Sequence, residues 1–296
     1  MLRTRIAPTP SGYLHIGNAV NFVLTWLWAR HDNGIVRLRI DDLDAPRIRE
    51  EYLTDIFETL QWLGIDWDEG PKSVEDHRKH FSQHLRNAQY KTLLQKLIAG
   101  GKVFACNCSR KNLKEAGNCS CYQKHLPLDT EDCALRILTP DSTMVVKDKA
   151  QGNLNIGLQN DMHNFVVRRK DGVAAYQLAS LADDLLYNIN LIVRGQDLLN
   201  STAAQLYLAQ LTDSSSFSQC QFYHHPLVKD AEGIKLSKSS GGTAIKTMRA
   251  QGYSAVQFYH YLSGLLGCGI MASSLNELLA EAKNGGSLFI RQGRLL

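Results

Sequence analysis

Two groups of residues, far apart in the chain, have types and a spacing that could bind phosphate groups. In the first, at residues 5–18, a short strand passes through a Pro- and Gly-rich turn to a helix start that carries His15 and Gly17. Backbone N–H groups at a helix N-terminus attract anions, and glycine lets a ligand approach the backbone closely. The imidazole of His15 could donate to a phosphate oxygen. The same pattern is also typical of an ordinary strand–turn–helix connection with an exposed histidine.

The second group consists of Lys235, Ser237 and Lys238, two cations three residues apart with small hydroxyl residues beside them. A flexible cationic loop of this kind can neutralise the charge that builds up on a transferring phosphate. A solvated basic turn is the ordinary alternative. If the two groups act together, the fold must bring His15 and Lys238 to the same nucleotide.

A third group is a cluster of four cysteines within 16 residues. Its members are Cys106, Cys108, Cys119 and Cys121. Four thiolates can close a tetrahedral zinc site, and a loop-rich segment with little core of its own gains stability from such a metal. Tyr122 and His125 are rival candidates for the fourth ligand, and unpaired thiols in a reducing compartment are the alternative to any metal site.

The order of expected elements indicates the scaffold that positions these groups. Strands are predicted at 3–7, 35–41, 134–138, 143–146, 165–168 and 191–194, and helices at 18–31, 50–63, 77–98, 176–187, 201–211, 255–266 and 275–282. Strands that alternate with helices favour a parallel α/β sheet. The cysteine-rich, irregular stretch after residue 103 interrupts that alternation, so we interpret it as an insertion between two halves of one nucleotide-binding fold.

The predicted fold is therefore an α/β, Rossmann-type parallel sheet with an insertion. We expect residues 1–102 to form the first half of the nucleotide-binding domain and residues 164–240 to form the second half. Residues 103–163 would be the insertion that carries the cysteine cluster, and residues 241–296 a short C-terminal helical stub.

Composition places the chain among ordinary globular proteins. Of its 296 residues, 44% are hydrophobic and 21% are charged, and the formal net charge of +4 is compatible with a nucleic-acid partner without requiring one. The N-terminus turns polar where a secretory signal would be apolar, and the longest apolar run, at 23–29, is too short to cross a bilayer. We therefore expect a cytoplasmic protein that is not associated with a membrane.

Taken together, the segments at 15–18 and 235–239 resemble the two ATP-binding motifs of class I aminoacyl-tRNA synthetases. Further segments resemble the glutamyl-tRNA synthetases in that family's order. They are Arg5-x-Ala7-Pro8-x-Pro10-x-Gly12, Arg39-Ile40-Asp41-Asp42-x-Asp44, Ala175-Tyr176-Gln177-Leu178-Ala179 with Asp183-Asp184, and Val193-Arg194-Gly195-x-Asp197-Leu198. The resemblance runs from about residue 3 to about residue 240. It implies a class I synthetase fold with a zinc-bearing insertion.

The resemblance also implies substrates and residue roles. ATP, with Mg²⁺, would be bound by Pro8, His15, Gly17, Asn18, Lys235, Ser237 and Lys238, with His15 and Lys238 on the phosphates in the transition state. L-Glutamate would be bound by Arg5, Ala7, Thr9, Asp41, Tyr176 and Arg194. The four cysteines would hold a structural Zn²⁺, the partner would be a tRNA, and the protein is expected to be a monomer.

Two positions depart from the family's pattern. The acid that binds the substrate's α-amino group is Asp41 here, one methylene shorter than the family's glutamate, and a capping or salt-bridging aspartate is the alternative. Gly117 stands where the family has a tyrosine zinc ligand, and Cys119 would supply the missing ligand. Tyr176 could alternatively be a core aromatic on its helix.

The segment after Ser240 has only 56 residues, enough for a helical stub but not for an anticodon-binding domain. In this the chain resembles the glutamyl-queuosine tRNA(Asp) synthetases, which join activated glutamate to queuosine in the anticodon loop. A tRNA 3′ end, a free amine or a carrier protein is an alternative acceptor, and a non-catalytic RNA-binding relic is an alternative of another class. Nucleotidylyltransferases share the His-x-Gly-type motif but lack the glutamate-pocket segments.

Overall fold

The computed structural model describes residues 1–44, 48–109, 111–112, 119–159, 161–227, 244–286 and 288–290. The chain forms two compact units. Unit 1 comprises Met1–Leu85, Asn190–Asp197 and Phe222–Leu296, and unit 2 comprises Arg86–Ile189 and Leu198–Gln221. The predicted loop residues Lys235, Ser237 and Lys238 lie outside the described residues.

Unit 1 is built on a β–α–β arrangement with parallel strands. The strand β1 (Arg3–Ile6) leads to the helix α1 (Ile16–His31) and then to β2 (Ile35–Leu38), which pairs with β1 in parallel from Arg3 opposite Ile35 to Ile6 opposite Leu38. A third strand, β8 (Leu191–Gly195), packs beside β1, and β9 (Gln221–His225) neighbours β8. The predicted parallel strands and the helix between them are confirmed.

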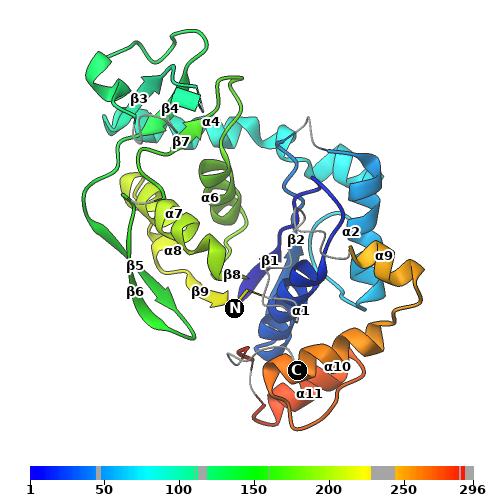
Figure 1. The fold of residues 1–296 in the computed structure, drawn as a ribbon. Helices are drawn as coiled ribbons and strands as arrows, with labels where there is room; N and C mark the ends of the chain where they lie inside the picture. Colours follow the sequence, from blue (N-terminus) through cyan, green and yellow to red (C-terminus); the bar gives the residue numbers. More distant parts are fainter. Residues whose placement is uncertain are drawn as a thin grey trace. The chain divides into compact units, whose positions relative to one another are not determined.

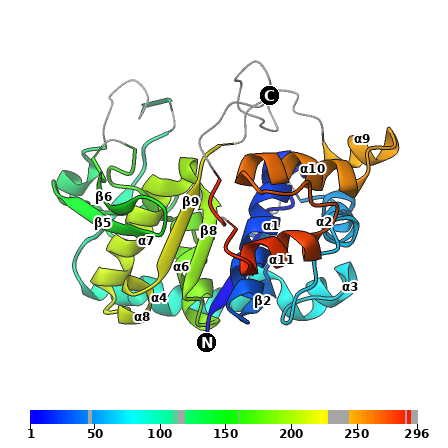
Figure 2. The same cartoon turned by 90° about the horizontal axis from the view of Figure 1, so that it is seen from below.

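The core of unit 1 lies around α1. The helix is buried along nearly its whole length, including Val23, Leu24 and Leu27, which are fully shielded from solvent. The helices α10 (Ala255–Leu266) and α11 (Leu275–Lys283) contribute to the same core, and Figures 1 and 2 show α11 lying against α1. Each of the two helices starts at a serine whose hydroxyl accepts a backbone N–H of the first turn, as expected for N-caps.

The region that follows β2 contains α2 (Glu50–Trp62), the single turn α3 (Val74–Asp76), a π-helical turn η2 (His77–Phe81) and the 3₁₀ turn η3 (Gln83–Arg86). The prediction of one continuous helix over 77–98 is wrong. The α-helix α4 occupies only Asn87–Ala99, because Ser82 and the backbone N–H of Gln83 hydrogen-bond to the carboxylate of Asp42 instead of continuing a helix.

Unit 2 combines antiparallel strands with helices. The three-stranded sheet contains β3 (Val103–Cys106), β4 (Ala134–Ile137) and β7 (Val166–Arg168), and an antiparallel hairpin pairs β5 (Thr143–Asp148) with β6 (Gly152–Gly157). The helices are α4, α6 (Tyr176–Leu186), α7 (Leu199–Leu211) and α8 (Ser215–Ser218). The strands β3, β6 and β9 were not predicted from the sequence.

A buried carboxylate joins two helices of unit 2. Arg86, just before α4, makes a two-pronged ion pair with Asp183 of α6, at 2.7 Å and 2.9 Å, and the hydroxyl of Tyr90 donates to the same carboxylate at 2.9 Å. Asp183 has no exposed surface. This aspartate of the motif predicted at 183–184 is therefore an anchor between α4 and α6. Among the described residues, no helix is both long and apolar enough to span a bilayer.

Candidate active site and a four-cysteine cluster

The residues around His15 form a compact helix start. His15 precedes α1 in an extended conformation, and its backbone N–H donates to Oδ1 of Asn18 at 3.0 Å. A Cβ at Gly17 would lie only 3.0 Å from Cε1 and Nδ1 of the His15 ring. Glycine therefore leaves the space that this imidazole occupies, and Asn18 has a structural role in addition to its predicted role in ATP binding.

The residue before His15 is held from two sides. The backbone N–H of Leu14 donates to Oδ2 of Asp55 on α2 at 3.0 Å, and its carbonyl accepts from Ile245 at 2.8 Å. Asp55 is buried, and its second oxygen pairs with Arg249 at 3.0 Å. Burial raises the pKa of the Asp55 carboxyl, while the Leu14 N–H and Arg249 oppose that shift. The position of His15 thus depends on residues far along the chain.

The described residues on either side of the predicted lysine loop contact α1 or the residue just before it. At the far flank, Ala244 forms an isolated antiparallel bridge with His15, and α9 (Ile245–Ala250) follows. At the near flank, Nε2 of His225, at the end of β9, lies 3.2 Å from Oδ1 of Asn21. The described chain therefore resumes beside His15 only six positions after Lys238.

The predicted amino-acid ligands of unit 1 gather where its parallel strands end. Backbone hydrogen bonds from Arg39 to Ile6 and from Asp41 to Pro8, both 2.9 Å long, continue the pairing past the ends of β1 and β2. Open parallel sheets bind ligands at these carboxyl ends. Six predicted residues share this region, namely Arg5, Ala7, Pro8 and Thr9 on the β1 side, Asp41 after β2, and Arg194 on β8.

Charged side chains in this region are buried, which is unusual without a partner or ligand. Arg5 is 5% exposed and Arg194 is 3% exposed. Asp41 makes a two-pronged ion pair with Arg39, from Nε at 2.7 Å and from the Nη2 nitrogen at 3.1 Å. The salt-bridging alternative for Asp41 is therefore observed, and Arg39 fixes the direction of its carboxylate.

Tyr176 belongs to unit 2, where it is the first residue of α6. Its side chain is 44% exposed. The alternative that Tyr176 is a core aromatic is therefore wrong, since a core ring would be almost fully covered. An exposed ring with a hydroxyl at a helix start remains available to a ligand.

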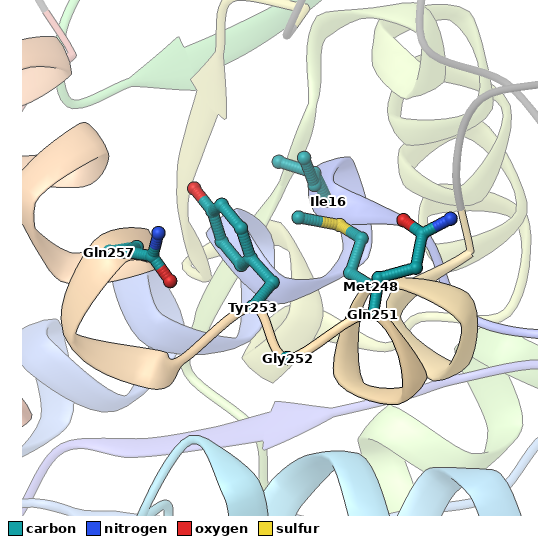
Figure 3. Close-up of a pocket in the computed structure, with 6 residues that line it drawn as sticks. All are labelled: Ile16, Met248, Gln251, Gly252, Tyr253 and Gln257. Atoms are coloured by element: carbon teal, nitrogen blue, oxygen red, sulfur yellow. The ribbon is translucent and has the colours of Figure 1, made fainter.

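A pocket of about 390 Å³ lies beside the start of α1 (Figure 3). It is lined by Ile16 together with Met248, Gln251, Gly252, Tyr253 and Gln257 from α9, α10 and the turn between them. None of these side chains is charged, so the pocket cannot by itself hold a triphosphate, which requires cations or several backbone N–H groups.

The four predicted cysteines come together in unit 2. Their Sγ atoms all lie within 4.8 Å of one another, with Cys106 and Cys119 at 3.4 Å and Cys108 and Cys121 at 3.4 Å. Four sulfurs about 2.3 Å from a tetrahedral zinc would be about 3.8 Å apart. The arrangement fits that ion. In the part of the chain that the structure describes, the potential metal-binding group of His, Cys, Asp and Glu side chains contains these four residues and not His125.

The close packing of the four thiols shifts the pKa values of three of them. Burial and the neighbouring sulfurs raise the pKa of Cys119 to about 12 and that of Cys108 to about 11. For Cys106 burial acts in the same direction, but the Cys108 N–H, the Cys119 thiol and Arg136 outweigh it and lower the pKa to about 7. One thiolate is thus stabilised by its neighbours, and a divalent cation would allow the others to ionise.

Sequence reasoning missed several residues that hold the site together. Asp55 and Arg249 support Leu14, and His77 contacts Asp42 next to the predicted ligand Asp41. No spacing rule identifies such pairs, because their partners are 35 to 194 positions away. The only signal is composition, since a charged side chain within an apolar helix face requires a partner.

Comparison with known proteins gives consistent matches. Residues 1–285 match the family model for the catalytic domain of class I tRNA synthetases (E and Q). The glutamyl-Q tRNA(Asp) synthetase of Nitratidesulfovibrio vulgaris is 36% identical over 285 residues, covering 90% of this chain and 87% of the relative. The same enzyme of Pseudomonas paraeruginosa is 38% identical over 236 residues, covering 79% and 76%.

Longer relatives match over part of their length. The glutamate–tRNA ligase of Thermodesulfovibrio yellowstonii is 32% identical over 277 residues, which is 90% of this chain but only 57% of that ligase. Among solved structures, a glutamate tRNA ligase from Elizabethkingia meningosepticum superposes with a TM-score of 0.79 at 22% identity, covering 99% of this chain and 67% of that one. The predicted class I synthetase fold is confirmed.

Proposed function

Because the chain belongs to the class I tRNA synthetase family of the glutamate and glutamine enzymes, and is thus an ATP-dependent ligase, we propose that it activates L-glutamate and transfers it to queuosine in the anticodon loop of tRNA(Asp). The observation that carries the glutamate assignment is the gathering of Arg5, Asp41 and Arg194 at the ends of adjacent strands. Arg5 and Arg194 suit the two carboxylates of glutamate, and Asp41, which Arg39 holds in place, suits its ammonium group.

In the first step, a carboxylate oxygen of the amino acid attacks the α-phosphorus of ATP. The bond to the β-phosphate oxygen breaks, and the products are an acyl-adenylate and pyrophosphate. The protein forms no covalent bond, so it contributes positioning and charge stabilisation. We assign this to His15 and Lys238, with Pro8, Gly17, Asn18, Lys235 and Ser237 around the nucleotide.

In the pocket for the amino acid, a guanidinium is suited to hold a carboxylate by two parallel hydrogen bonds. We assign Arg5 to the side-chain carboxylate and Asp41 to the α-ammonium group. Arg194 and the hydroxyl of Tyr176 complete the site, together with Ala7 and Thr9. In the second step a hydroxyl of the acceptor attacks the acyl carbon, its proton is released and AMP leaves.

Two metal ions belong to this proposal. Mg²⁺ would accompany the ATP phosphates, where oxygen ligands suit it. Zn²⁺ would be held by the four cysteine sulfurs and would stabilise the loop-rich segment around them, without taking part in the reaction. The tRNA partner supports a cytoplasmic location, and we expect a monomer.

Queuosine as the acceptor is supported by the two relatives of 36% and 38% identity that carry that activity in their names. A tRNA 3′ end, a free amine or a carrier protein is the alternative acceptor. An RNA-binding relic without catalysis would not need the charged groups at the strand ends. Glutamine is the competing amino acid, because the family includes enzymes for both substrates and Asp41 departs from the glutamate pattern.

The activation step is tested by pyrophosphate exchange with each amino acid, with and without tRNA. We expect exchange with glutamate and with no other amino acid, and we expect it to occur without tRNA. Lys238→Ala should lower it by about 10²–10³-fold, the typical cost of losing one charge-stabilising group, while the melting temperature stays unchanged. Exchange with glutamine instead of glutamate, or near-normal exchange in Lys238→Ala, would refute the assignment.

The acceptor is tested with labelled glutamate and tRNA from cells that contain or lack queuosine. We expect label only on the queuosine-containing tRNA. Label that persists on tRNA without queuosine would instead favour the 3′ end. Activation without transfer to either tRNA would favour an amine or carrier acceptor.

A further inference from the structure

The residue next to the predicted ammonium ligand is held by an unusual number of contacts. Asp42 is buried, and its carboxylate accepts three hydrogen bonds, from the backbone N–H of Gln83 at 2.7 Å, from Oγ of Ser82 at 2.7 Å and from Nε2 of His77 at 2.9 Å. Burial favours the neutral acid, but these three donors outweigh it and lower the pKa of Asp42. The carboxylate is therefore ionised, and Nε2 of His77 carries the proton.

The same short segment also contacts the backbone of this turn. Nε2 of His84 lies 3.0 Å from the carbonyl oxygen of Asp42, and the N–H of Leu43 donates to Oε1 of Gln83 at 3.2 Å. Five contacts thus join residues 77–84 to two consecutive residues. We call this set of contacts the His77 clamp.

The clamp is produced by an irregular backbone. Residues His77–Phe81 form a π-helical turn, and the chain leaves the helix at Ser82. A regular helix would spread His77, Ser82 and Gln83 around its axis, at 100° per residue. The π-turn instead brings all three donors to one carboxylate. Short π-helical segments are rare in proteins, and many of those that occur lie at functional sites.

The backbone connects the clamped residues directly to Asp41. Because Arg39 and Asp41 both continue the pairing with the β1 side, residues 39–41 are extended, and successive side chains of an extended chain point to opposite sides. The carboxylates of Asp41 and Asp42 therefore face different surroundings. Arg39 holds Asp41 on one side and the His77 clamp holds Asp42 on the other.

We propose that His77 is a positioning residue for amino-acid recognition, which fixes Asp42 so that the neighbouring Asp41 carboxylate meets the substrate's α-ammonium group. This proposal rests on the function assigned above. An aspartate is one methylene shorter than a glutamate, so its reach depends more directly on where the backbone lies. The His77 clamp fixes this backbone position from outside the pocket.

The test compares binding of L-glutamate with binding of glutarate, which keeps both carboxylates and lacks the amino group. In calorimetry, His77→Leu should weaken L-glutamate binding about tenfold, because a hydrogen bond to a charged group is lost, and should leave glutarate binding unchanged. In exchange assays the same variant should raise KM for the amino acid about tenfold, with kcat and the KM for ATP within about twofold of wild type.

Three further variants separate positioning from general stability. His77→Gln retains an N–H donor and should restore most of the affinity for L-glutamate. Ser82→Ala removes a second donor by a milder change and should give a smaller effect in the same direction. His80→Ala, on the exposed side of the same turn, is the matched control and should behave as wild type.

Equal weakening of L-glutamate and glutarate, or a lower melting temperature with unchanged affinities, would overturn the proposal and leave the clamp as a purely structural feature. Failure of the proposed function has a different signature. In that case wild type itself fails to bind L-glutamate and to exchange pyrophosphate with it, whatever residue stands at position 77.

Discussion

Gly17→Ala should raise the stability of the protein and lower its activity at the same time. The new Cβ would lie 3.0 Å from Cε1 and Nδ1 of His15, whereas ordinary contact begins at 3.4 Å, so the ring must move by about 0.4 Å. Displacement of a reacting group by 1 Å can cost about 10²-fold in rate. A shift of about 0.4 Å then corresponds to a fall of about five- to tenfold in pyrophosphate exchange.

The stability change has the opposite sign. Gly17 lies in the first turn of α1 and does not have the positive φ that would penalise alanine. Replacement of a helical glycine by alanine stabilises by about 0.4–1 kcal/mol, mainly because the unfolded chain loses freedom. For a chain of this size the melting temperature should rise by about 1–4 °C.

Gly264→Ala is the matched control. Gly264 lies within α10, and a Cβ there would meet nothing within 4 Å. It should give a similar rise in melting temperature with unchanged exchange. If Gly17→Ala exchanges pyrophosphate at the wild-type rate, the reasoning that His15 must keep this ring position to act on the phosphates is refuted.

Three more predictions follow from buried groups. Cys119→Ser should lower both the zinc content, expected to be one ion per chain by metal analysis, and the melting temperature, whereas Cys268→Ser, outside the cluster, should leave the zinc content unchanged. Asp183→Asn should cost about 3–5 kcal/mol in urea unfolding, because it leaves a buried guanidinium unpaired, against less than about 1 kcal/mol for the exposed Asp171→Asn. The folded-state pKa of Asp42 is depressed below its ordinary value of 3.8, so its contribution to stability is complete above that pH and is lost as pH falls through the folded pKa. The difference in unfolding free energy between wild type and Asp42→Asn should therefore be constant near pH 6 and shrink below about pH 4, and a difference that grows toward acid would contradict this.

The sequence was sufficient to predict features that depend on local pattern. The periodic apolar residues of α1, the alternation in β2 and the serine caps of α10 and α11 each encode their element within a few residues. The cysteine cluster was also predictable, because its four ligands lie within 16 positions and chemistry allows few other uses of them.

Features that depend on distant partners were not predictable. The apolar spacing after residue 77 favours one helix, yet the donors at 82 and 83 stabilise a buried carboxylate 40 positions earlier, and that tertiary interaction overrides local propensity. For β3, β6 and β9, the pairing partners supply most of the signal for strand formation. For the same reason, the buried pair of Asp55 and Arg249 left no pattern in the sequence.

The segment that was expected to be a C-terminal stub has a consequence for anyone who would shorten or re-engineer this protein. Ile245, Phe258, Leu262 and Leu278 are members of the same apolar core as α1, and Arg249 neutralises the aspartate that supports the residue before His15. Cutting the chain near position 240 would therefore expose hydrophobic surface and leave the carboxylate of Asp55 without its Arg249 partner in the interior of unit 1. The final helices complete the hydrophobic core that supports α1 and His15, and a minimal folded fragment has to include them.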